Sequence, residues 1–448
     1  MGSTTESIEE LLALHDAQLR GRLPVPPPVG GVVEQDGPVV RIHYGTHATI
    51  DHRALPTEGL DELIARQRDA CAARGEPVEW KVYAHDSPPD LPQRLRAAGF
   101  IAGWERSVLV APVQQIATTD PLPSLAEVVE VSEHRYLQDV ALFVAGTGPQ
   151  PTRFTEFLAD GRMLRWADHV LVARHDGRIR AAAWAEYLAD TNFVSIGGIT
   201  DPELMFADHL CAWDWQRSDS IGSNRTADRR YVVAEADGAL QSVLETAGMR
   251  VIATVTAFHW IPEDPPAKTR PVRQLLDDPE HNTLWDRFYT EFEFRPSTTT
   301  SPGITEPTAS ATWHLGALDR TDAGSEQDGV EQLQRIISAG LLACRKPGEV
   351  IYWLDWHHAG YRFDPSRVGG TGQPNWPGSA CPDGDYYIYL TPDFRLGTFG
   401  HPWEYTLCVF GDQLLAEVEA QITDLLGAPI RRGGRSVGNT WAFGTDAP

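Results

Sequence analysis

The sequence predicts an α/β fold for residues 1–262 and a separate α+β domain from about residue 270 onward. Three observations lead to this prediction. A strand–turn–helix–strand pattern occurs twice in the first part, a stretch with four prolines (residues 261–274) follows it, and helices flank aromatic-rich strands after that stretch. Proline disfavours helices and central strands, so the stretch indicates a domain boundary. A chain of 448 residues is also too long for one ordinary core.

The first copy of the pattern lies before residue 115. Residues Val78–Tyr83 predict a strand, Leu91–Ala98 a short helix, and the apolar residues up to Val110 a second strand. Gly99 stands directly after the helix, where glycine commonly ends one. This order of elements is typical of one half of a mixed α/β sheet.

The second copy, residues 231–260, has the same order of strand, turn, helix, Ala-Gly cap and strand. Residues 111–124 carry proline and threonine without periodicity and therefore indicate a linker between the copies. The sequence thus predicts two diverged α/β units, residues 1–115 and 116–262.

Four stretches of these units resemble a group of actinobacterial N-acetyltransferases of the GNAT superfamily: residues 79–110, 170–187, 193–200 and 240–249. The resemblance covers roughly residues 30–262 and implies two GNAT-like units in tandem. In that superfamily the backbone of the fourth strand pairs with the pantetheine arm of acyl-CoA. The corresponding residues of this sequence are Ile196, Gly197, Gly198 and Ile199.

The turn after that strand departs from the superfamily pattern. The pattern has an arginine and two glycines, whose backbone N–H groups approach the CoA pyrophosphate closely. Here the corresponding positions are Met205, Phe206, Ala207 and Asp208. A carboxylate at Asp208 repels a diphosphate, so acetyl-CoA is disfavoured as a cofactor. We expect no anion-binding turn here, and a helix over residues 207–217 that packs its first turn closed.

The C-terminal domain, residues 270–448, resembles a bacterial family of unknown function through residues 285–296, 352–365 and 383–411. Amphipathic helices are predicted over residues 331–343 and 413–427, with aromatic-rich strands between them. The resemblance implies no chemistry, so the candidate site rests on the residues themselves.

Two dense polar clusters predict a site in this domain. Asp355, Tyr361 and Arg362 lie in YWLDWHHAGYRF, and His401 and Glu404 lie in GHPWE after the predicted strand DYYIYL. A histidine with carboxylates supports general acid–base chemistry, and an arginine binds anions. We therefore expect all five residues to line one cavity, with His401 removable at little cost in stability. The alternative interpretation is a buried network in which Asp355, Arg362 and His401 satisfy one another.

A metal site is not expected. His357 and His358 are consecutive, and consecutive side chains of a strand point to opposite faces. Five widely spaced cysteines and no CxxC argue against a thiolate site or a disulfide framework. The formal charge of −24 opposes nucleic-acid binding. No apolar run is long enough for a membrane span, and the N-terminus lacks a signal-peptide pattern, so a cytoplasmic protein without membrane association is expected.

Three functional hypotheses follow. In the first, a GNAT scaffold that has lost its CoA loop binds or acts on a small molecule, such as an amine or natural product, at a site in the C-terminal domain. In the second, the protein is a working acyl-CoA-dependent N-acetyltransferase. In the third, it is a non-catalytic interaction or immunity-type protein. The sequence leaves the substrate and the oligomeric state open.

Overall fold

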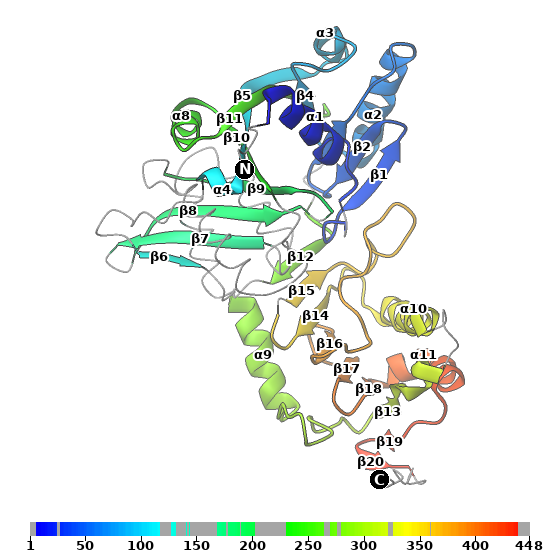
Figure 1. The fold of residues 1–448 in the computed structure, drawn as a ribbon. Coiled ribbons are helices and arrows are strands. Elements are labelled where there is room, and N and C mark those ends of the chain that lie inside the picture. The colour runs from blue at the N-terminus through cyan, green and yellow to red at the C-terminus, as the bar shows by residue number, and fades with distance from the viewer. Residues whose placement is uncertain are drawn as a thin grey trace. The chain divides into compact units, whose positions relative to one another are not determined.

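The computed structural model describes the whole chain except residues 1–5, 25–26, 117–126, 131–139, 141–142, 144–167, 176–177, 189, 202–229, 264–268, 276–278, 321–325, 359 and 438–448. It divides into two compact units (Figure 1), unit 1 being Met1–Arg270 and unit 2 Pro271–Pro448. Within the described residues, no helix is both long and apolar enough to cross a bilayer.

Unit 1 begins with one copy of the repeated pattern. Its elements are α1 (Ile8–Leu19), β1 (Val32–Asp36), β2 (Val39–His43), β3 (Ala48–His52), α2 (Leu60–Arg74), β4 (Val78–Tyr83), α3 (Leu91–Ala97) and β5 (Ile101–Pro112). Ser7 and Glu10 form a capping box that starts α1. Gly75 ends α2 with a φ of 63°, a left-handed conformation that glycine adopts without strain.

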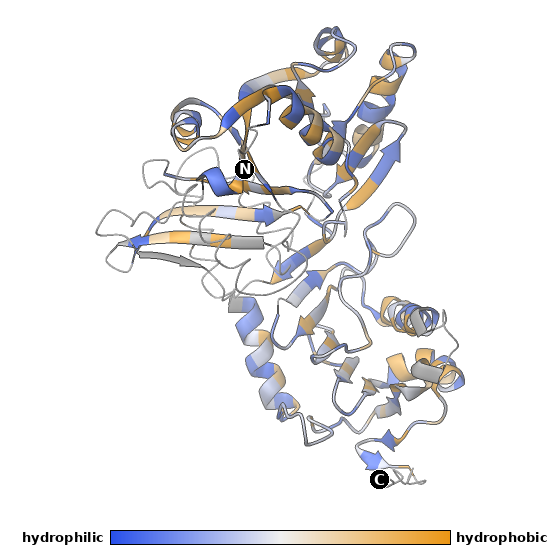
Figure 2. Ribbon diagram, viewed as in Figure 1, coloured by the Kyte–Doolittle hydropathy of each residue, from blue (hydrophilic) through white to orange (hydrophobic). Residues whose placement is uncertain are grey.

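The second copy ends, like the first, with a strand, a helix and a strand. Its described elements are α4 (Val113–Ile116), β6 (Glu127–Glu130), β7 (Asp168–His175), β8 (Arg178–Tyr187), β9 (Phe193–Gly197), β10 (Tyr231–Ala236), α8 (Gly238–Thr246) and β11 (Arg250–Trp260). The middles of β7 and β8 are largely hydrophobic (Figure 2), as strands buried on both faces require.

The two copies share a single sheet and exchange their last strands. The strand order is β1-β2-β3-β4-β11-β5-β10-β9-β8-β7-β6. The last strand of the second copy, β11, pairs with β4 of the first, and β5 of the first pairs with β10 of the second. Figure 1 shows β5, β10 and β11 side by side in the middle of the sheet. The two related units predicted from the sequence are therefore present, and neither completes its sheet without the other.

Both copies contain a parallel strand pair that separates after three residue pairs. In the first copy β3 and β4 pair from Ala48–Val78 to Ile50–Trp80. In the second, β9 and β10 pair from Phe193–Tyr231 to Ser195–Val233. Among the described residues, the rest of each strand has no strand partner on that side, and we call this separation of the two strands the opening of the sheet.

Unit 2 is a nine-stranded sheet with helices on both faces. Its elements are β12 (Val272–Leu275), α9 (Pro279–Glu291), β13 (Ser310–His314), the 3-10 helix η4 (Leu315–Arg320), α10 (Glu326–Cys344), β14 (Ile351–Asp355), β15 (Gly360–Phe363), β16 (Tyr387–Leu390), β17 (Gly397–His401), β18 (Thr406–Phe410), α11 (Asp412–Leu426), β19 (Arg431–Arg432) and β20 (Arg435–Ser436). The strand order is β12-β15-β14-β16-β17-β18-β13-β19-β20. Figure 1 shows α9 on one side of this sheet and α10 and α11 on the other.

The fold class predicted from the sequence is confirmed: a mixed α/β part with two related copies is followed by a separate α+β part. The helices predicted over 331–343 and 413–427 are α10 and α11. Residues 397–401 form β17, a central strand that His401 ends, so GHPWE runs from the end of that strand into the turn before β18.

Candidate functional site

The five candidate residues do not share one face of the unit 2 sheet. Leu354, Ile388 and Phe399 oppose one another across β14, β16 and β17 and belong to the core that contains the buried side of α9. His401 is two residues beyond Phe399 and lies on that same face, whereas Asp355 follows Leu354 and lies on the opposite one. The expected single cavity is therefore not formed, because side chains alternate between the faces of a strand.

His401 is buried, with 1% of its surface exposed. Its Nδ1 accepts the backbone N–H of Glu404 at 3.0 Å, and its Nε2 lies 3.5 Å from the hydroxyl of Tyr386. Its ring makes edge contacts with Phe399 and Trp403. Burial lowers the pKa of His401 below its ordinary value. The surroundings are those of a neutral histidine that closes the β17–β18 turn.

Glu404 belongs to a second set of contacts that we name the Arg431 cluster, formed by Arg431, Glu404, Glu306, Thr312 and Thr406. Arg431 binds Glu404 through two N–H groups, at 2.5 and 2.8 Å, and donates its Nε–H to Glu306 at 2.8 Å. Thr406 and Thr312 donate to Glu404 and Glu306, respectively. Burial opposes the charge of Glu404, but Arg431 outweighs it and holds the pKa of Glu404 below the ordinary value.

Tyr361 and Arg362 point away from each other. Tyr361 pairs with Trp353 across β14 and β15, and their rings stack with centroids 5.7 Å apart. Arg362 is opposite Tyr352, on the α9 face, and its Nε lies 3.8 Å from the Oε1 of Glu280. The two side chains therefore lie on opposite faces of the sheet.

Asp355 gathers a different group of polar side chains. The strand β14 ends at Asp355, and the backbone N–H of His358 bonds back to the carbonyl of Asp355 at 3.4 Å. Because the chain turns here, the alternation expected for consecutive histidines on a strand does not apply. His358 Nδ1 lies 3.0 Å from Asp355 Oδ1, and His357 Nδ1 lies 2.6 Å from Asp385 Oδ2. His358 Nδ1 also lies 3.9 Å from Asp385 Oδ2, so His358 contacts both aspartates and His357 contacts Asp385.

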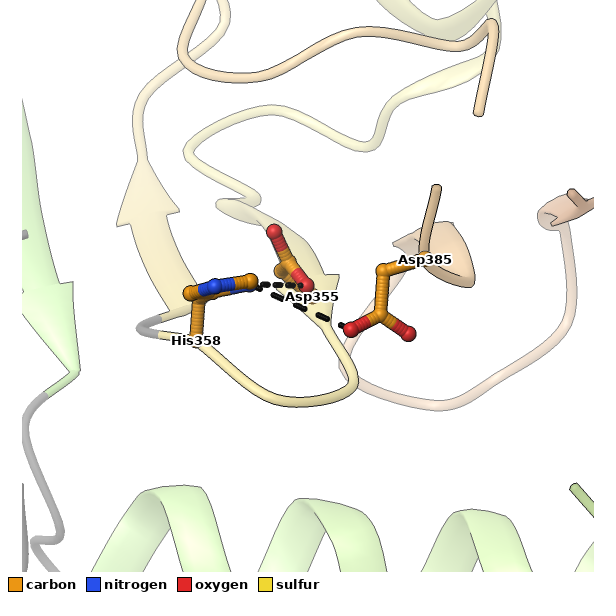
Figure 3. A group of neighbouring side chains, drawn as sticks. All are labelled: Asp355, His358 and Asp385. Carbon is orange, nitrogen blue, oxygen red and sulfur yellow. Dashed lines mark hydrogen bonds and ion pairs between the residues drawn. The ribbon is translucent and has the colours of Figure 1, made fainter. Parts of the chain in front are cut away.

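We name Asp355, His357, His358 and Asp385 the Asp355 cluster. The aspartate side chains are 8% and 7% exposed, whereas those of His357 and His358 are 59% and 54% exposed. Figure 3 shows Asp355 and Asp385 approaching the His358 ring from two segments of the chain. The cluster is therefore buried at its carboxylates and open at its imidazoles.

Few interactions offset the charges of the two aspartates. Among the described residues, their ion pairs are with histidines only. Burial raises the pKa of Asp355, and the hydrogen bond from His358 opposes that shift only in part. Asp385 also accepts the backbone N–H of Tyr386 at 2.8 Å. Next to the cluster the rings of Trp356 and His357 are 3.8 Å apart, which adds an aromatic wall.

Sequence reasoning did not single out Asp385. It lies in DGDYYIYL, where a carboxylate stands two residues before a strand that pairs with β14. The available signal was the strand pairing of two aromatic stretches, and a single sequence does not give that pairing.

In unit 1, the predicted cofactor residues lie at the end of β9. Gly198 adopts a φ of 63°, and Thr200 bonds through its backbone N–H to Ala182 of β8 at 3.1 Å. The ring of Trp184 lies against Gly197, where an added Cβ would stand 2.4 Å from it. Ile196 is buried, and residues 197–199 are partly exposed. Met205, Phe206, Ala207, Asp208 and the helix expected over 207–217 lie outside the described residues.

The corresponding opening of the first copy is closed by charged side chains. His52 accepts the indole N–H of Trp80 at 3.1 Å and lies 3.2 Å from Asp86. Asp86 also contacts Arg20 at 2.5 Å, and the Arg20 guanidinium stacks on Tyr83. His52, Asp86 and Arg20 are almost fully buried. Buried charged side chains therefore lie where β3 and β4 separate.

Comparison with known proteins agrees with the division into two units. Residues 275–415 match the family described as "Protein of unknown function (DUF2716)". "Uncharacterized protein YxiI" of Bacillus subtilis (strain 168) is 39% identical over 72 residues, which is 16% of this chain and 44% of that protein. The chain thus matches less than half the length of this curated relative.

Similar solved structures include GNAT proteins. A GCN5-related N-acetyltransferase from Kribbella flavida has a TM-score of 0.41 and 14% identity, covering 59% of this chain and 99% of its own. A tandem GNAT protein from the clavulanic acid biosynthesis pathway has a TM-score of 0.40 and 12% identity, covering 57% and 96%. Both resemblances noted in the sequence are found again. The strand order of unit 1, rather than these scores, establishes its fold.

Proposed function

We propose that this protein binds or modifies a small molecule without acyl-CoA, and that the site is the Asp355 cluster of unit 2. The carrying observation is the contrast within the cluster, whose carboxylates are 7–8% exposed while its imidazoles are more than half exposed. A buried network that only supports the fold satisfies its polar groups internally. Here the histidines present their free edges to solvent.

Unit 1 supports the proposal by what it lacks. Charged residues close the opening of the first copy. The second copy carries no glycine or arginine at Met205–Asp208 for a pyrophosphate. We therefore propose that unit 1 is a GNAT-type scaffold and that the chemistry lies in unit 2. A ligand with an aromatic ring fits best, because Trp356 stands beside His357.

A second candidate function is acyl-CoA-dependent N-acetyl transfer. One observation favours it: β9 and β10 separate after three residue pairs, and within the described part of the chain the backbone of residues 196–199 has no strand partner on that side. Calorimetric titration of the full-length chain with acetyl-CoA decides between the two functions. We expect no saturable heat up to millimolar ligand. Stoichiometric micromolar binding would contradict the proposal and support the transferase.

The position of the site is tested by thermal stabilisation with three probes: tyramine, benzoate and phenyl phosphate. A ligand at many times its Kd raises the melting temperature by several degrees. We expect at least one probe to stabilise the wild type and to lose that effect in His357→Ala. The control is His314→Ala, an exposed histidine elsewhere in unit 2. Equal stabilisation of wild type and His357→Ala would place the ligand elsewhere.

A further inference from the structure

Three side chains of the Asp355 cluster converge on one point. One nitrogen of His358 and one carboxylate oxygen each from Asp355 and Asp385 all lie within 4.8 Å of one another. His358 Nδ1 is 3.0 Å from Asp355 Oδ1 and 3.9 Å from Asp385 Oδ2. Figure 3 shows these two contacts fanning out from a single ring.

These separations match a shared metal ion. Ligand atoms roughly 2.1 Å from an ion in tetrahedral geometry lie about 3.4 Å from one another. The two measured distances, 3.0 and 3.9 Å, fall on either side of that value. The third pair of ligand atoms, one oxygen from each aspartate, lies within 4.8 Å, so an ion between the three atoms draws the two carboxylates together.

The negative charge of the two aspartates favours a bound cation. Two aspartates with side chains 8% and 7% exposed have no lysine or arginine ion pair in the part of the chain that the structure describes. Buried carboxylates are paired or bind metal in most proteins, because the loss of hydration is otherwise uncompensated. A histidine proton compensates this charge only while the ring is protonated, whereas a divalent ion compensates both carboxylates at once.

The cluster is also accessible and has an outer support. His358 is more than half exposed, so an ion can enter from solvent and keep a water molecule in its fourth position. His357 donates to Asp385, as partners behind a ligand do when they fix its orientation. One imidazole with two carboxylates suits Zn²⁺ or Mn²⁺ better than the soft ions that thiolates select.

We propose that Asp355, His358 and Asp385 bind one divalent cation of the Zn²⁺ or Mn²⁺ class. This inference rests on the proposed function in one respect: it assigns a metal ion to the cluster that the proposed function uses as its site. The argument against metal from the sequence assumed that β14 continues through the histidines, and the turn after Asp355 removes that assumption.

The test uses the full-length chain after treatment with a chelator. Titration calorimetry with ZnCl₂, and electron paramagnetic resonance with MnCl₂, measure affinity and stoichiometry. We expect one specific site per chain, with affinity reduced at least tenfold in Asp355→Asn, His358→Gln and Asp385→Asn. The control His314→Gln removes an exposed histidine of the same unit and leaves the affinity unchanged.

Two results overturn the proposal: no specific binding of either ion, or binding that the three cluster variants retain in full. Circular dichroism of each variant separates loss of the site from loss of the fold, and His358→Gln changes an exposed position that tolerates the change. A different measurement tests the proposed function, so the two failures can be told apart. Acetyl-CoA binding would overturn that function while leaving the metal titration unaffected, and absence of metal leaves the His357-dependent probe stabilisation to stand.

Discussion

The Arg431 cluster and the Asp355 cluster lie in the same unit and both gather acidic side chains, but they are built in opposite ways. In the Arg431 cluster, Glu404 and Glu306 share one largely buried guanidinium, and a threonine donates to each of them. In the Asp355 cluster, two buried carboxylates meet exposed imidazoles. The difference teaches that carboxylates held by a shared, buried guanidinium support the fold, whereas buried carboxylates that face exposed imidazoles are available for ligands.

The largest loss of stability is expected when the Arg431 cluster is broken. Arg431→Met leaves Glu306, whose side chain is 1% exposed, without its counter-ion. Removing one partner of a buried ion pair costs about 3–5 kcal/mol, so we expect a loss of that size in the unfolding transition of unit 2, measured by calorimetry. The control is Arg432→Met on the same strand, whose exposed pair with Glu419 contributes less than about 1 kcal/mol. Equal losses in both variants would erase the comparison.

The next effect concerns His401, for which the structure reverses the expectation of a small cost. His401→Ala removes a buried ring and the acceptor of the Glu404 N–H. A cavity together with an unsatisfied donor costs about 2–3 kcal/mol, measured by urea unfolding. His401→Asn, which can place an oxygen near the position of Nδ1, should lose less. A neutral His401→Ala would make His401 a site residue again.

Acid sharpens the comparison through Glu404. Its pKa in the folded protein lies below the ordinary value of 4.5, because Arg431 outweighs the opposing effect of burial. An acid with a lowered folded pKa stabilises the protein above its unfolded pKa, and that contribution disappears as pH falls through the folded pKa. Urea midpoints between about pH 6 and pH 3 should therefore fall less steeply in Arg431→Met than in the wild type. Parallel curves for the two proteins would show that Arg431 does not lower the pKa of Glu404.

The Asp355 cluster should respond with the opposite sign. Asp355→Asn removes a buried charge but keeps an oxygen that accepts from His358. Replacing a functional residue that costs stability often raises the unfolding free energy by roughly 0.5–1 kcal/mol. We therefore expect a small rise of this size in Asp355→Asn, measured on chelator-treated protein. A loss above about 2 kcal/mol would place Asp355 among the structural residues.

The smallest effect belongs to the exposed histidine. His357→Gln changes a side chain that is 59% exposed, so we expect the melting free energy to stay within about 0.5 kcal/mol of the wild type. Ligand-dependent stabilisation should change in the same variant. If stability falls while ligand response is unchanged, the two clusters have the same structural role.

Much of the fold was predictable because its signals are local. The strand Val78–Tyr83 has the bounds that its residues predict, and the predicted helix Leu91–Ala98 differs from α3 by one residue. Gly99, with a φ of 92°, ends that helix as its position indicated. Periodicity and turn residues suffice for such elements, since each depends on neighbours a few residues away. The exchange of β5 and β11 between the copies had no local signal, because it depends on which strands meet and not on neighbouring residues.

The sequence by itself determined that the chain has two related α/β copies and a separate α+β part, and that unit 2 carries the dense polar chemistry. Only the tertiary structure decided which polar residues meet. Whether Asp355 lies beside Asp385 or His401 depends on where β14 ends and on the register of β14, β16 and β17. A shift of one residue moves a side chain to the other face of a sheet, and the pairing of separate strands sets that register. The residue types therefore indicated which chemistry is possible, whereas the strand register determined which of these residues lie together in the cluster.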